Sequence, residues 1–120
     1  MIKNILLVGM GGFMGAAARY IIQCFIKTNQ PFYTTLLINI IGSFFIGIII
    51  AYSLKNAALN NHWKLFLATG ICGGFTTFST FSMENYHLLI EGKYLSALIY
   101  ITLSIILGVA AVFLGIKIIS

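Results

Sequence analysis

Hydroxyl and aromatic side chains gather in one stretch of this sequence, residues 70–84, in a pattern suited to holding a small ion. Gly70, Gly73 and Gly74 precede a run of threonine, serine and phenylalanine that ends at Glu84. Because glycines followed by hydroxyl residues make a poor apolar helix, the pattern predicts a break within it. A break frees backbone carbonyls, which then need another partner or a cation.

Phenylalanine recurs at every third position of this stretch, at Phe75, Phe78 and Phe81. On a helix, Phe78 and Phe81 share a face. In an arbitrary helix such a pair packs in the core. Here the hydroxyls of Ser79 and Thr80 surround the rings, which favours the interpretation that the rings line a water-filled passage.

A polar stripe runs along a second apolar segment, where Thr35, Asn39 and Ser43 recur every fourth residue. Residues four apart lie on one helix face. The stripe fits hydrogen bonding between helices, and equally fits donors that replace the water around an anion. A second set with the same spacing is Tyr100, Ser104 and Gly108.

Arg19 is the basic residue well inside an apolar segment. Its side chain either reaches the interface or faces inward and makes the local potential favourable to anions. Cys24 and Cys72 lack a metal-binding or redox spacing, and His62 and His87 form no metal constellation. We find no nucleophile with a base and no phosphate loop, so the sequence predicts no enzyme.

Composition defines the class of protein. Of 120 residues, 60% are hydrophobic and 8% are charged, with a net charge of +5. A chain this short cannot bury so much apolar surface within itself, so something apolar must surround it. This excludes a soluble enzyme, a disordered tail and a disulfide scaffold. The lysines are too dispersed for a nucleic-acid partner.

The few charges divide the chain into apolar blocks. Each block is long enough to cross a bilayer, which takes about 20 residues of helix. Spanning segments must satisfy their backbone groups internally, so we expect helices. The sequence predicts an all-α membrane protein with one domain, residues 1–120. Its expected spans are residues 4–26, 32–54, 65–90 and 94–117.

Orientation is weakly specified by the lysines between the spans. Counting them gives four on one side and two on the other, a small bias. One interpretation puts the richer side in the cytoplasm, and the other is dual topology, with subunits inserted both ways and paired antiparallel. The first side has Lys3, Lys55, Lys64 and Lys117, and the second has Lys27 and Lys93.

Motifs in three of the four expected spans occur in a recognisable order. They are Gly11-Gly12-x-x-Gly15-Ala16-x-x-Arg19-Tyr20, then Thr35-Leu36-x-x-Asn39-x-x-Gly42-Ser43-Phe44-x-x-Gly47, then Gly70-x-x-Gly73-Gly74-Phe75-Thr76-Thr77-Phe78-Ser79-Thr80-Phe81-Ser82-x-Glu84. Over essentially the whole chain, the sequence resembles the Fluc (CrcB) family of fluoride channels. The third motif is highly specific.

This resemblance implies four-helix subunits, the third helix broken in mid-membrane, that form an antiparallel dual-topology homodimer with two pores. It implies a structural Na⁺ at the dimer interface, held by the backbone carbonyls of Gly73 and Thr76. Gly108 departs from the family, since some members carry serine there. The implied pore residues are Phe78, Phe81, Asn39, Ser79, Thr80, Tyr100 and Ser104, and the implied vestibule residues are Arg19 and Glu84.

The function that the resemblance implies is a passive, highly selective channel that exports cytoplasmic fluoride across the cell (inner) membrane, as a multi-pass protein in the lipid bilayer. One alternative is a small multidrug-type proton antiporter, which needs a carboxylate in the middle of the membrane. The first three spans instead have Arg19 in such a position, and Glu84 lies near the end of its span. Another is a non-transporting membrane assembly subunit, in which the polar stripes only join helices.

Overall fold

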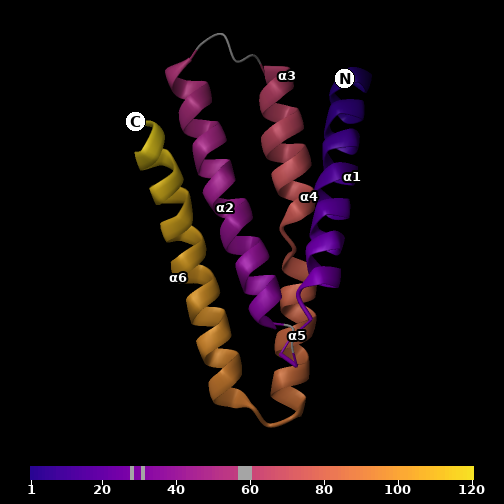
Figure 1. The fold of residues 1–120 in the computed structure, drawn as a ribbon, viewed down its shortest axis with the longest axis vertical. Helices are drawn as coiled ribbons and strands as arrows, with labels where there is room; N and C mark the ends of the chain where they lie inside the picture. Colours follow the sequence, from indigo (N-terminus) through magenta and orange to yellow (C-terminus); the bar gives the residue numbers. More distant parts are fainter. Residues whose placement is uncertain (28, 31, 57–60) are drawn as a thin grey trace.

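The computed structural model describes residues 1–27, 29–30, 32–56 and 61–120, and its regular structure there is entirely helical. Four helical segments are long and apolar enough to cross a membrane, which confirms the prediction of a multi-pass helical protein. Three are continuous helices: α1 (Ile2–Phe25), α2 (Phe32–Lys55) and α6 (Tyr94–Ile119). They stand along the long axis, with the α5–α6 turn at one end and both termini toward the other (Figure 1).

The third segment is built from four pieces. α3 (Asn61–Lys64), the π-helical η1 (Leu65–Cys72) and α4 (Gly73–Phe75) follow one another without a gap. Thr76 and Thr77 are then extended, with φ/ψ of −78°/157° and −147°/117°, before α5 (Phe78–Ile90) begins. The ribbon of Figure 1 narrows between α4 and α5 at this point. This two-residue interruption brings backbone polar groups into the interior of the bundle.

Glycines let the helices touch at their backbones. A Cβ added to Gly11 of α1 would lie 2.8 Å from the Gly70 Cα, and one added to Gly74 would lie 2.5 Å from the Gly12 oxygen. Gly115 closes the α2–α6 contact in the same way. Small residues at such positions let membrane helices pack closely. This packing holds α1 against the segment that carries the interruption.

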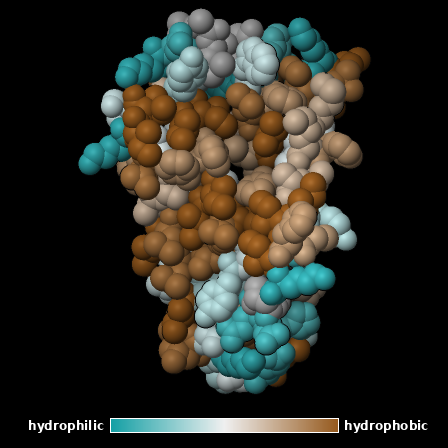
Figure 2. Space-filling model, viewed as in Figure 1, coloured by the Kyte–Doolittle hydropathy of each residue, from teal (hydrophilic) through white to brown (hydrophobic). Residues whose placement is uncertain are grey.

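The outer surface is apolar around the middle of the molecule. Figure 2 shows a broad hydrophobic band between two more hydrophilic ends. Large side chains point outward, including Phe13, 76% exposed, and Phe113, 70% exposed. Exposed apolar surface on this scale needs lipid or another protein to cover it.

Candidate ion-binding site at the helix interruption

Asn39 of α2 pairs with the backbone of the interruption. The Thr77 N–H donates to Asn39 Oδ1 at 2.8 Å, and Asn39 Nδ2 donates to the Thr77 carbonyl at 3.2 Å. Thr77 is only 8% exposed, so water cannot replace these bonds easily. The side-chain amide thus satisfies both backbone polar groups of Thr77, as a neighbouring β-strand would, and holds Thr77 in its extended conformation.

Arg19 of α1 binds one backbone carbonyl just before the interruption and one within it. Its Nη1 donates to the Gly74 oxygen at 2.7 Å and to the Thr76 oxygen at 3.2 Å. The last carbonyls of a helix have no partner within it and carry negative partial charge, which a guanidinium complements. Arg19 therefore caps the end of α4 and brings a positive charge beside the interruption.

The carbonyl of Gly73 also loses its α-helical partner. In a continuous helix it would accept from the Thr77 N–H, which here donates to Asn39. The Thr76 oxygen would accept from the Thr80 N–H, which here donates to Thr77 Oγ1 at 3.2 Å. Two backbone oxygens are thus released from helical hydrogen bonding at this point.

Three hydroxyls gather where α5 begins. Thr77 Oγ1 caps the helix by accepting from the Thr80 N–H, donates to Thr80 Oγ1 at 3.1 Å and lies 3.3 Å from Ser79 Oγ. Threonine is a favoured residue at this capping position. The cluster presents hydroxyl groups at the positive end of a helix, which is an environment that favours anions.

Glu84 lies one to two turns further along α5 and accepts two hydrogen bonds from other helices. Thr35 Oγ1 of α2 donates to its Oε2 at 3.0 Å, and the Tyr100 hydroxyl of α6 donates to its Oε1 at 2.8 Å. Each oxygen of the carboxyl group thus accepts one hydrogen bond. Glu84 therefore joins α2, α5 and α6.

A row of aromatic rings connects the two ends of this site. The Phe78 and Phe81 centroids are 5.6 Å apart, and the edge-on Phe81–Tyr100 pair is at 5.0 Å with an interplanar angle of 65°. Phe78 is 78% exposed in the single chain. The rings therefore extend from the outer surface of the chain to the carboxylate of Glu84.

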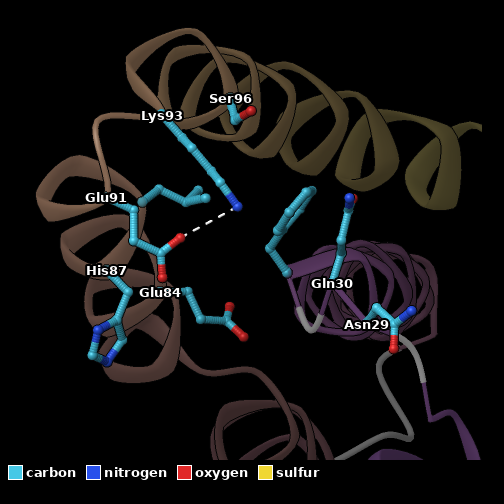
Figure 3. A pocket seen from close by; sticks show the side chains of 9 residues that line it. Asn29, Gln30, Glu84, His87, Glu91, Lys93 and Ser96 are labelled. Carbon is cyan, nitrogen blue, oxygen red and sulfur yellow. Dashed lines mark ion pairs between the residues drawn. The ribbon is translucent and has the colours of Figure 1, made fainter.

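A cavity of about 390 Å³ adjoins Glu84 at the end of the bundle that carries the α5–α6 turn. Figure 3 shows the Glu84 carboxylate directed toward it and Lys93 reaching Glu91, 3.3 Å away. Arg19 is not among the described residues that line it. Its lining consists of Asn29, Gln30, Phe32, Glu84, His87, Leu88, Glu91, Lys93 and Ser96.

The structure brings most of the predicted site residues together in two groups. The first surrounds the interruption, and the second follows the aromatic row to Glu84. Ser104 is linked to neither group: its hydroxyl is buried and has no hydrogen-bond partner among the described residues. The first group contains Asn39, Arg19, Gly73, Thr76, Ser79 and Thr80, and the second contains Phe78, Phe81, Tyr100 and Glu84.

Two residues at the centre of these groups were absent from the predicted site. Thr77 could have been found, because a threonine directly before a helix start is a capping signal. Thr35 was recognised as part of a polar stripe, but spacing alone does not reveal its partner Glu84.

Among the described residues, no cluster of three or more histidine, cysteine, aspartate or glutamate side chains forms a metal site. What the site offers is hydroxyl and amide donors, backbone oxygens and ring edges.

Comparison with known proteins agrees with the motif order. Residues 6–116 match the family described as CrcB-like protein, Camphor Resistance (CrcB). Three curated relatives are each named "Fluoride-specific ion channel FluC". That of Azobacteroides pseudotrichonymphae is 45% identical over 119 residues, covering 96% of this chain and 94% of its own. Those of Oceanobacillus iheyensis and Chlorobium chlorochromatii are 42% and 44% identical, covering 96% and 94% of this chain and 90% and 89% of their own. This chain belongs to the CrcB family.

Proposed function

We propose that this protein is a passive, fluoride-selective channel of the cell (inner) membrane that exports cytoplasmic fluoride. The observation that carries the proposal is the 45% identity, over 119 residues, to a relative named as a fluoride-specific ion channel. The geometry supports the same function, since hydroxyl donors and aromatic edges gather beside an interruption in an otherwise apolar helix.

Fluoride is small and strongly hydrated, so a pore must replace its water with donors. Thr80, Ser79 and the Tyr100 phenol carry hydroxyls for this role, and Asn39 Nδ2 has a second N–H beyond the one given to Thr77. Ring edges carry positive partial charge, so Phe78 and Phe81 can meet an anion edge-on. Ser104 adds a buried hydroxyl whose partner would be the permeating ion.

No energy source is needed for export. Hydrogen fluoride is neutral, crosses membranes and dissociates inside the cell. The negative interior then favours exit of the anion by about 2.3 kcal/mol per 100 mV. A passive pore is therefore sufficient.

We infer that the working unit is an antiparallel dual-topology homodimer with two pores. Phe78 is 78% exposed in one chain, so a pore wall built on this ring needs a second copy to close it. Cysteine labelling from each side of the membrane tests the topology. Equal labelling of one position from both sides is expected, and labelling from a single side would contradict dual topology.

A structural Na⁺ at the interface, bound by the carbonyls of Gly73 and Thr76, is consistent with the residues present. Both oxygens are released from helical bonding, and a carbonyl has two lone pairs, so Thr76 can serve Arg19 and an ion together. Each chain would offer these two carbonyls, and the partner would supply its own pair. When bound, the ion supplies fixed positive charge. Replacing Na⁺ with N-methylglucamine should lower the dimer's melting temperature, and an unchanged value would remove the ion from the proposal.

Fluoride efflux from liposomes tests the channel directly. The purified protein is reconstituted, valinomycin is added to clamp the potential, and an ion-selective electrode follows fluoride, with chloride as the control. Rapid valinomycin-dependent fluoride efflux without chloride leakage is expected. A folded protein that passes no fluoride would refute the proposal and favour a non-transporting assembly subunit.

A further inference from the structure

The Glu84 carboxylate accepts hydrogen bonds from two hydroxyl groups that an entering anion would also need. Thr35 and Tyr100 are 1% and 2% exposed, and both donate to the Glu84 carboxylate, at 3.0 and 2.8 Å. A hydroxyl has one hydrogen to donate. While Glu84 holds both, neither hydroxyl can bind another anion, so an ion that reaches this point must displace the carboxylate.

The carboxylate has space to move into. Glu84 lines the cavity of about 390 Å³, and Figure 3 shows its carboxylate directed toward that space. His87, Ser96 and Lys93 line the same cavity. A rotated Glu84 would therefore enter a polar cavity instead of an apolar interior, which keeps the cost of displacement low.

We propose that Glu84 is a specificity-determining residue that competes with the permeating anion for the Thr35 and Tyr100 hydroxyls. This inference rests on the proposed channel function. Hydrogen bonds to charged acceptors are short and strong, and their strength follows the charge density of the acceptor. Fluoride concentrates its charge enough to displace a carboxylate from two hydroxyls, whereas chloride, which is larger, does not. The carboxylate thus rejects weak acceptors through competition, in addition to any limit set by pore width.

A purely structural role predicts different behaviour. If Glu84 only joins α2, α5 and α6, its removal loosens the bundle and lowers flux of every ion at every concentration. If it competes with fluoride, its removal increases the apparent affinity for fluoride and admits chloride to the vacated donors. Only the competing role therefore predicts a higher apparent affinity for fluoride and entry of chloride.

The test is fluoride efflux from liposomes as a function of fluoride concentration, with chloride added as a competitor. In Glu84→Ala, and in Glu84→Gln where the shape is kept, the half-saturating fluoride concentration should fall by about tenfold, and chloride should inhibit efflux. The matched control is Glu91→Gln, which removes a carboxyl group from the same cavity. The Glu91 side chain is 56% exposed and is paired with Lys93. This variant should leave both quantities unchanged. Unchanged half-saturation and chloride rejection in both folded Glu84 variants, or a flux lost at all concentrations, would overturn the proposal.

Infrared difference spectroscopy tests the displacement without mutating the pore donors. Fluoride added to the wild-type protein should shift the antisymmetric carboxylate stretch of Glu84, and the same band should be missing from the difference spectrum of Glu84→Gln. Fluoride efflux without such a shift would refute this inference alone. Absence of fluoride efflux from the wild-type protein would instead refute the channel function on which it rests.

Discussion

Replacement of Asn39 by alanine removes the partner of a buried peptide group and should release the helix interruption. The change deletes the acceptor of the Thr77 N–H, bonded at 2.8 Å, and the donor to its carbonyl, bonded at 3.2 Å. A buried donor without a partner costs about 1–3 kcal/mol, and the second bond contributes about 1 kcal/mol. Together these give a loss of about 2–4 kcal/mol at Thr77, which is 8% exposed and cannot recover both bonds from water.

Hydrogen exchange measures this loss locally. Because each 1.4 kcal/mol is a factor of ten, the Thr77 amide should exchange about 30- to 700-fold faster in Asn39→Ala than in the wild-type protein. Mass spectrometry of fragments that cover residues 73–81 reports the rate. Ser43→Ala, one turn further along α2, is the control and should leave the rate within a factor of about two. We also expect fluoride flux to fall, because the hydroxyls that follow Thr77 lose their position.

Asn39→Asp separates the two bonds. Its carboxylate still accepts from the Thr77 N–H but points an oxygen at the Thr77 carbonyl in place of the amide donor. Protection of the amide should largely remain, while flux falls severely because a fixed negative charge stands beside the anion path. A Thr77 amide that stays fully protected in Asn39→Ala would refute the role assigned to Asn39, and normal flux in Asn39→Asp would remove it from the path.

Three further predictions concern the packing, the cap and the rings. Gly74→Ala should lower the free energy of unfolding by about 1–3 kcal/mol, because the new Cβ would lie 2.5 Å from a backbone oxygen of α1. The control is Gly108→Ala, whose Cβ would meet a side-chain oxygen at 3.9 Å. It should change the free energy of unfolding by less than about 1 kcal/mol. Equal melting temperatures would contradict the close approach of these helices. Arg19→Gln should increase deuterium uptake across residues 73–78, since it weakens the cap on two carbonyls, and unchanged uptake would show that the guanidinium is dispensable there. Phe78→Ile and Phe81→Ile should each reduce fluoride efflux from liposomes while the oligomeric state is kept, and full efflux in both would exclude the rings from the pore.

Several features of the fold could be predicted from composition and order alone. Apolar runs of bilayer length with few charges specify four spanning helices, because unpaired backbone groups cannot face lipid. Gly73 and Gly74 followed by threonines indicate poor helix formation at the point where Thr76 and Thr77 are extended. These are local properties, and each follows from a few adjacent side chains.

The partners of the polar residues depended on the tertiary structure. Arg19 reaches carbonyls 55 and 57 residues away, Asn39 pairs with a residue 38 away, and Thr35 binds a carboxylate 49 away. Spacing along one helix left the polar stripe open to several roles, because it specifies which face a side chain occupies but not what lies opposite. Glycine contacts set that register: α1 and α4 meet at backbone distance, and this approach brings Arg19 to the interruption. The sequence thus determined which donors and charges the protein carries, and helix packing decided which of them meet.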